Sequence, residues 1–394
     1  MSPVPFGAGL FLENIEKDNE MKKILLFLIT TFLPVATQAQ LNGDGYYRII
    51  NNGTNRYITI TDDIVGSVNM SNTQVDLSNI TTWKGFDYVK SSPASILYIE
   101  AVNGQYNMSC QGTSIYKIAG GKTYLNIDPR SDGTYVFSAA YSGVTARLYD
   151  SNDLENDEGY VLRTGESANC YWRLIPVNTD DNYIGLQPTV QTNDGWYGTV
   201  YAEYPFKVVS EGIKVYYVDG IKDGVFQLQE ITDEVKPGAT PLVFKCSSND
   251  PAQNKIMPVY TSTTPADNNL LRGTYFASLI NGHEVYVKYN AKTMRVLGVN
   301  EAGELTFTTA QESYLKKKKY IPMNTCWIDV PEGLSGDFKL VSREEYTTGI
   351  RDIKTDTKNN KADDTIYTLT GTKANNKALR PGIYIQNGKK IVIK

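Results

Sequence analysis

The sequence contains a single histidine, His283, among its 394 residues. A zinc site built from several histidines is therefore excluded, and a histidine-dependent catalytic triad would have to use His283. That residue directly follows Asn281 and Gly282, a turn signal, and the chain has neither a Gly-x-Ser-x-Gly motif nor the sequence context of a catalytic cysteine. The sequence thus offers no catalytic residue, and we expect a protein without enzymatic activity, cofactor or metal.

The sequence also lacks a large excess of positive or negative charge, and it lacks long apolar runs. The 39 Lys and Arg residues nearly balance the 43 Asp and Glu residues, for a net charge of -4, which argues against a nucleic-acid partner. The four lysines at 316–319 form only a small basic patch, which favours a solvated loop over a binding site for an anionic partner. The longest apolar run, Ile24–Leu33, is too short to cross a bilayer of about 30 Å. We expect neither nucleic-acid binding nor stable membrane insertion.

Residues 21–39 have the pattern of a secretory signal peptide. Lys22 and Lys23 precede the apolar run, and small residues up to Ala39 follow it. The acidic residues within 1–20 would be unusual in a signal, so we expect the signal to start at Met21 and to be cleaved near Ala39. The sequence therefore predicts a secreted or cell-surface protein.

Export permits disulfides, and the number of cysteines is even. Two of them fall in each of two predicted domains, which favours the pairs Cys110–Cys170 and Cys246–Cys326. Four buried thiols are an equally good interpretation.

The remaining composition indicates an all-β fold. Thirty-two Gly and 28 Tyr are typical of many short strands joined by turns, and no segment shows a helical period. Polar stretches divide the chain after 177 and again after 346. We expect a β-trefoil-like domain at 41–177, a β-sandwich-like domain at 183–346, a linker at 347–364 and a small β-hairpin tail at 365–394.

The first domain carries a family resemblance. The segments YYRIINNGTNRYITI and CYWRLIPV resemble the ricin-B-type β-trefoil, with Cys170-Tyr171-Trp172 at the position of its Gln-x-Trp turn. The resemblance implies a lectin-like domain whose sugar pocket combines an Asp with an aromatic platform. At the aligned positions Thr59 and Asn126 replace that Asp.

Two groups of residues are candidates for a surviving pocket. One is Asn126 and Asp128 with Tyr135, and the other is Asp62 and Asp63 with Tyr57. A carboxylate or amide would bind vicinal hydroxyl groups while an aromatic face covers the apolar side of the sugar. The alternative is that these tyrosines only pack within the fold.

The second domain resembles a group of secreted Bacteroidetes-type proteins. The segments that carry the resemblance are PFKVVSEGIKVYYVDGI, PGATPLVFKC, NNLLRGTY, AKTMRVLGVNEAGELTF and YIPMNTCWIDVP. It implies an exported β-rich module and brings no catalytic residue with it.

The last thirty residues resemble the C-terminal sorting domain of such proteins. The positions that match its strand-and-hairpin pattern are Tyr367, Leu369, Gly371, Gly382, Ile383, Tyr384, Ile385, Gly388, Lys389 and Lys390. The resemblance implies either type IX export to the cell surface or a retained relative of that domain.

Three functions remain in order of preference. The first is an exported or cell-surface binding protein with carbohydrate as its ligand class. The second is a structural or adhesive surface protein that binds another protein. The third is a glycoside hydrolase, which would need two carboxylates about 5–10 Å apart in one cleft. The oligomeric state stays open.

Overall fold

The computed structural model describes residues 41, 44–60, 81–111, 113–114, 117–118, 121–122, 124–141, 143–150, 161–222, 224–275, 277, 286–316, 319–348, 365–368, 373–374, 379, 381–386 and 389–393. Strands dominate them, and the α-helices α2 (Phe86–Val89) and α3 (Arg343–Thr348) are short, so the all-β prediction is confirmed. None of the described helices is long and apolar enough to cross a membrane. The predicted signal peptide, His283 and most of the linker lie outside the described residues.

Two compact units divide the chain, Met1–Leu340 and Val341–Lys394. Within the first unit the sheets separate into two groups, strands before residue 177 and strands after residue 183, which we call the first and second halves. The placement of the domain boundaries themselves stays a prediction.

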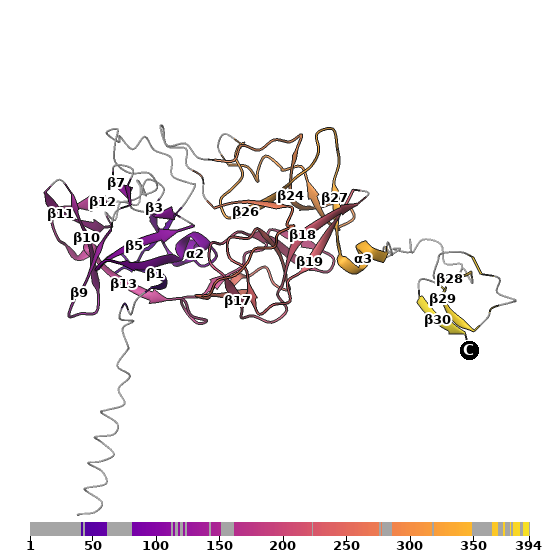
Figure 1. Ribbon diagram of the computed structural model, residues 1–394, viewed down its shortest axis with the longest axis horizontal. Helices are drawn as coiled ribbons and strands as arrows, with labels where there is room; N and C mark the ends of the chain where they lie inside the picture. The colour runs from indigo at the N-terminus through magenta and orange to yellow at the C-terminus, as the bar shows by residue number, and fades with distance from the viewer. Residues whose placement is uncertain are drawn as a thin grey trace, which may run out of the picture. The chain divides into compact units, whose positions relative to one another are not determined.

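The first half contains a closed ring of six strands, in the order β1-β4-β5-β9-β10-β13. Figure 1 labels β1, β5, β9, β10 and β13 of this ring. The ring closes between β5 and β9, where Tyr106 and Leu125 exchange backbone hydrogen bonds of 2.8 and 2.7 Å. These strands are β1 (Gly45–Asn51), β4 (Leu97–Val102), β5 (Gln105–Cys110), β9 (Asn126–Pro129), β10 (Tyr135–Tyr141) and β13 (Tyr171–Pro176).

Further strands lie between the ring strands along the chain. They pair as β2 with β3, β7 with β8 and β11 with β12, so each third of the first half has ring strands at its ends and a hairpin between them. A six-stranded barrel with three hairpins is the arrangement of a β-trefoil. The bounds are β2 (Tyr57–Ile60), β3 (Thr81–Lys84), β6 (Thr113–Ser114), β7 (Lys117–Ile118), β8 (Gly121–Lys122), β11 (Val144–Tyr149) and β12 (Val161–Arg163).

Alternation along the ring strands sends apolar side chains into the barrel. Ile49, Ile99 and Phe137 are fully buried there, together with Trp172 from the predicted Gln-x-Trp position. The Trp172 ring stacks on Phe137 with centroids 6.2 Å apart, and its Nε1 donates to the Leu148 carbonyl at 3.2 Å. This tryptophan therefore belongs to the barrel core.

The second half is built on a ten-stranded sheet, in the order β15-β16-β21-β18-β19-β27-β25-β24-β26-β23. The sheet folds back on itself, because strands from its two ends share one apolar core: Val243 and Tyr197 pack with Leu297 and Ile328. The Cys326 amide also donates to Thr199 Oγ1 at 3.2 Å, which joins β26 to β16. The two facing layers agree with the predicted sandwich, although one continuous sheet supplies both.

The strands of this sheet are β15 (Val190–Thr192), β16 (Gly195–Val200), β18 (Lys214–Lys222), β19 (Val225–Glu230), β21 (Leu242–Cys246), β23 (Leu271–Thr274), β24 (Met294–Val299), β25 (Leu305–Thr308), β26 (Thr325–Asp329) and β27 (Phe338–Ser342).

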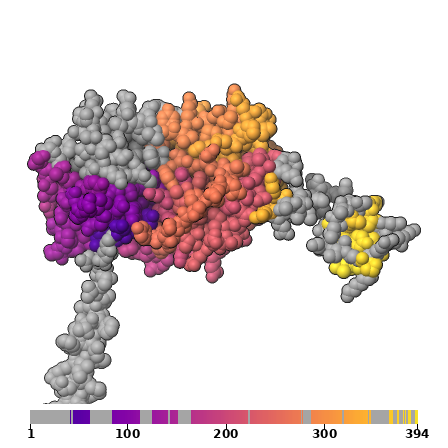
Figure 2. All heavy atoms as spheres, in the orientation of Figure 1, coloured from indigo at the N-terminus to yellow at the C-terminus, as the bar shows by residue number. Residues whose placement is uncertain are grey.

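A four-stranded sheet adds a further layer, in the order β14 (Ile184–Gly185), β22 (Lys255–Pro258), β17 (Phe206–Val208), β20 (Val235–Lys236). Its Phe206 and Ile256 pack against Val215 and Phe244 of the large sheet. Ile96 of the first half is buried in the same cluster. The two halves therefore share a core, and their surfaces adjoin on the face drawn in Figure 2.

A buried arginine reinforces this junction. Arg48 of β1 has no exposed surface, and its guanidinium donates to the carbonyls of Val89 and Tyr183 at 2.7 and 2.5 Å. It also donates to Ser95 Oγ at 3.2 Å and to Asn182 Oδ1 at 3.3 Å. Because these acceptors lie on both sides of the junction, Arg48 connects the two halves.

The predicted disulfides are not present. All four cysteines are buried free thiols. Cys110 Sγ donates to the Ala94 carbonyl at 3.2 Å and Cys326 Sγ to the Val200 carbonyl at 3.5 Å, so each thiol has its own partner within an apolar core. The interpretation as buried thiols is the one that agrees with the structure.

The second unit contains a three-stranded antiparallel sheet, β28-β29-β30, besides α3. Its strands are β28 (Ile366–Thr368), β29 (Gly382–Gln386) and β30 (Lys389–Ile393). The register pairs Ile385 with Lys390, as expected for a final hairpin.

Candidate functional site

The first predicted sugar site does not assemble around its tyrosine. Asn126 and Asp128 point to solvent from β9, and the Asn126 side chain accepts a hydrogen bond from Gln105 Nε2 at 3.2 Å. Tyr135, which pairs with Pro129 across the sheet, is only 7% exposed and packs inside the barrel. Strand alternation places the two groups on opposite faces, so Tyr135 offers no open ring face to a ligand beside Asn126 and Asp128.

The second predicted sugar site is only partly described. Tyr57 is 9% exposed and packs with Val89, while its ring lies 6.0 Å from that of Phe86. Asp62 and Asp63 lie outside the described residues. Tyr57 therefore acts as a packing residue, as the alternative interpretation expected, and no sugar pocket is described beside it.

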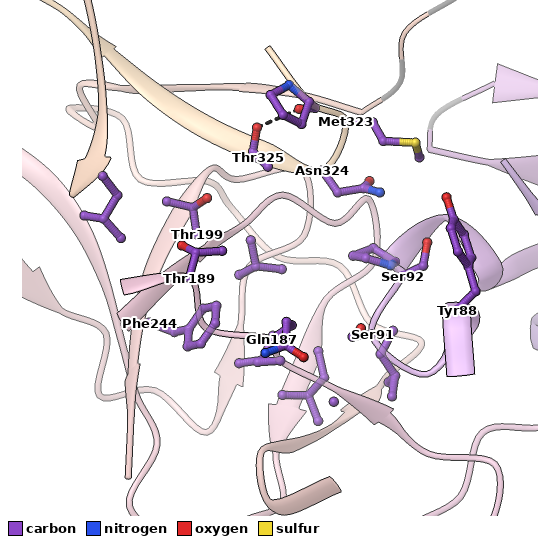
Figure 3. A pocket seen from close by; sticks show the side chains of 18 of the residues that line it. Tyr88, Ser91, Ser92, Gln187, Thr189, Thr199, Phe244, Met323, Asn324 and Thr325 are labelled. Atoms are coloured by element: carbon purple, nitrogen blue, oxygen red, sulfur yellow. Dashed lines mark hydrogen bonds between the residues drawn. The ribbon is translucent and has the colours of Figure 1, made fainter. Parts of the chain in front are cut away.

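A cavity of about 310 Å³ lies between the two halves instead (Figure 3). Three stretches of the chain meet around it: the turn after α2, strands of the second half, and the loop before β26. The lining residues are Tyr88, Ser91, Ser92, Pro93, Ile184, Gly185, Leu186, Gln187, Thr189, Thr199, Val200, Phe244, Ile256, Leu297, Tyr314, Lys316, Pro322, Met323, Asn324 and Thr325.

The apolar part of the lining is rigid because it belongs to the shared core. Ile184, Val200, Phe244 and Ile256 are at most 3% exposed and pack together. The Gly185 amide, which donates to the Lys90 carbonyl at 2.8 Å, ties this wall to the first half. The cavity therefore has a preformed floor, as small-molecule sites usually do.

Hydroxyl and amide groups supply the polar part of the lining. In Figure 3, Tyr88 and Ser92 lie on one side of the cavity, and Thr189 and Thr199 lie on the other. Several of these groups are held in place: Thr199 Oγ1 accepts from the Cys326 amide, and Thr325 Oγ1 donates to the Pro322 carbonyl at 2.6 Å. The Tyr88 ring is 36% exposed and can offer an apolar face.

The chemistry of the lining suits recognition. Among its described residues Lys316 is the one charged side chain, and burial raises the pKa of Tyr314 to about 12, so that phenol stays neutral. Neither a carboxylate nor a thiol is among them, and the described residues contain no cluster of three His, Cys, Asp or Glu that could hold a metal. The arrangement can form hydrogen bonds and stacking contacts with a neutral polar ligand.

Sequence reasoning missed this cavity for a physical reason. Its walls come from segments near residues 90, 185, 199 and 323, which meet only through tertiary packing. The run Ser91-Ser92-Pro93 is a plain turn signal, and Thr199 sits in an ordinary strand pattern. No local spacing in the sequence distinguishes these residues from other surface positions.

Comparison with known proteins gives no family for the chain. No protein-family model and no curated protein matches it. One solved structure, described as "Structure and mode of action of a mosquitocidal holotoxin", matches at 10% identity with a TM-score of 0.24. The match covers 75% of this chain and 45% of that one, so this chain spans less than half of that structure's length. A likeness at this level carries no argument about function.

Proposed function

We propose that this chain is an exported or cell-surface, non-catalytic protein that binds carbohydrate. The observation that carries the proposal is the cavity between the halves, in which hydroxyl and amide groups surround an apolar floor next to the exposed Tyr88 ring. Sugars present alternating hydroxyl groups and apolar C–H faces, which such a lining complements. Its volume suits a small ligand or the terminal residue of a glycan.

Two further features support the individual parts of the proposal. Export follows from the signal-peptide pattern at 21–39 and the sorting-type tail at 365–394. A binding role is supported by the lining, because its hydroxyl, amide and aromatic groups suit hydrogen bonding and stacking with a ligand.

The test is glycan-array binding of the full chain, purified after export, with variants of the cavity. Tyr88→Ala removes the ring that we place against the sugar, and we expect affinity for any array hit to fall about tenfold, which corresponds to about 1.4 kcal/mol. Tyr124→Ala is the matched control, because Tyr124 is 38% exposed and lies outside the cavity. Thr189→Trp, at an exposed position on the lining, should fill the cavity and remove the part of the binding that depends on Tyr88, whereas Thr145→Trp on β11 should not.

Two outcomes would overturn the proposal. One is silence across the array, which would favour a protein partner. The other is array binding that survives both Tyr88→Ala and Thr189→Trp at full strength.

A further inference from the structure

Three tyrosines from both halves form a continuous aromatic surface away from the cavity lining. Tyr46 of β1 and Tyr98 of β4 have ring centroids 5.2 Å apart, and Tyr98 and Tyr260 have centroids 5.9 Å apart with an interplanar angle of 15°. We call these three residues, together with Asp44, the tyrosine shelf. None of the four lines the cavity.

Tyr260 is the unusual member of the shelf. It is 70% exposed, although a large ring is costly to leave in water. Its position is fixed, because one side stacks on Tyr98 and the neighbouring Val259 amide donates to the Pro205 carbonyl at 2.9 Å. With one side covered and most of its surface accessible, the ring presents a preorganised apolar face to solvent.

Polar atoms lie directly beside this face. Tyr98 Oη is 3.2 Å from Tyr260 Oη and 3.5 Å from Asp44 Oδ2, while Asp44 Oδ1 accepts from the Ala101 amide at 2.8 Å. Tyr98 has one hydroxyl proton and therefore serves one of these two acceptors at a time. The Tyr260 hydroxyl proton and the remaining carboxylate lone pairs of Asp44 are available to a ligand.

Burial and the local charges keep the phenols of Tyr98 and Tyr46 protonated. Burial, followed by hydrogen bonding to Tyr260 and by the carboxylates of Asp44 and Glu100, raises the pKa of Tyr98. Burial, Glu203 and Tyr260 raise the pKa of Tyr46 to about 12. Both phenols are therefore neutral donors at physiological pH, and the acidic surroundings disfavour an anionic ligand.

We propose that the tyrosine shelf is a second saccharide-binding site, in which a neutral pyranose ring stacks on Tyr260 and its hydroxyl groups bind Asp44 and the phenols of Tyr98 and Tyr260. Tyr98 Oη lies 3.2 Å from Tyr260 Oη and 3.5 Å from Asp44 Oδ2, so the three oxygens are close enough to bind hydroxyl groups of one sugar ring. The inference shares the ligand class of the proposed function but depends on different residues. Two sites on one unit would give a branched or repeating glycan a gain in avidity.

The experiment uses saturation-transfer NMR on the full chain with the methyl glycosides of glucose, galactose, mannose and N-acetylglucosamine. It is run in the Thr189→Trp background, in which the cavity is filled. We expect transfer from the protein to one face of at least one glycoside, and a loss of tenfold or more in affinity with Tyr260→Ala. Tyr260→Phe keeps the stacking ring, so its affinity for the glycoside should fall only a few-fold. Asp44→Asn should weaken glycoside binding, and Tyr124→Ala should leave the affinity unchanged.

The outcomes separate the two sites. Absence of transfer in the Thr189→Trp background, or binding that Tyr260→Ala leaves intact, would overturn the shelf proposal and leave the cavity proposal standing. Loss of all binding with Tyr260→Ala alone, in a chain with an open cavity, would support the shelf and overturn the cavity. If the chain binds tetramethylammonium chloride but none of the glycosides, the shelf is a cation site and the saccharide assignment is refuted.

Discussion

Replacing Arg48 with alanine should destabilise both halves of the first unit together. The variant loses four hydrogen bonds, of which the two shortest go to the carbonyls of Val89 and Tyr183. Hydrogen bonds from a charged donor contribute about 1.5–3 kcal/mol each, so these two account for about 3–6 kcal/mol. Part of this is offset, because burial penalises the charge and lowers the pKa of Arg48 to about 10. We expect a net loss of about 3 kcal/mol.

The assay is urea unfolding of the full chain followed by tryptophan fluorescence, since Trp172 reports on the first half and Trp196 and Trp327 on the second. A loss of this size corresponds to a midpoint shift of roughly 1 M. Arg272→Ala is the control, because the Arg272 side chain is 68% exposed and its ion pair with Asp329 should contribute at most about 1 kcal/mol. If Arg48→Ala costs no more than Arg272→Ala, the reasoning about the junction is refuted.

Three further predictions concern buried groups. The Tyr204 hydroxyl is buried without a hydrogen-bond partner among the described residues, so Tyr204→Phe should raise the free energy of unfolding by about 1 kcal/mol, and a loss in urea unfolding would contradict this. The pKa of Tyr46 and of Tyr314 is raised to about 12, chiefly by burial. Because the unfolded chain releases these protons near pH 10, their stabilising contribution is present below pH 10 and is lost between pH 10 and 12, which urea midpoints at pH 8 and 11 will measure. Finally, a thiol-reactive dye in denaturant without reductant should titrate four thiols, whereas fewer would indicate disulfides.

The turns of the first half could be predicted because they depend on local chemistry. The chain reverses between β4 and β5 at Asn103 and Gly104, which have φ of 51° and 81°, a conformation that these residue types tolerate. The same residue types do not always form a turn. Asp219-Gly220 has the composition of a turn, yet it lies within β18, where the register shifts between Val218 and Gly220. A bulge uses the same residue types as a turn, and only the partner strand distinguishes the two.

The cysteine pairing and the sugar site could not be predicted because both depend on the contacts that side chains make only in the folded chain. Tyr135 lies one strand from Asp128, but strand alternation directs it inward. Cys110 lies in the same barrel and forms its hydrogen bond to the Ala94 carbonyl. A shared predicted domain suggested the cysteine pairs, and nearness along the chain grouped Tyr135 with Asp128, but in the fold these side chains have other neighbours.

The junction of the two halves explains why the candidate sites lie where they do. The barrel of the first half fills its interior with large side chains such as Trp172 and Phe137, which stack on each other. Concave space arises where a second layered body packs against it imperfectly, as at the cavity next to Tyr88 and Phe244. The same junction brings Tyr260 onto Tyr98 and builds a surface that neither half has alone. Ligand binding at both proposed sites then depends on the contact between the two halves. Arg48→Ala, which loosens that contact, should weaken binding at both sites although Arg48 belongs to neither.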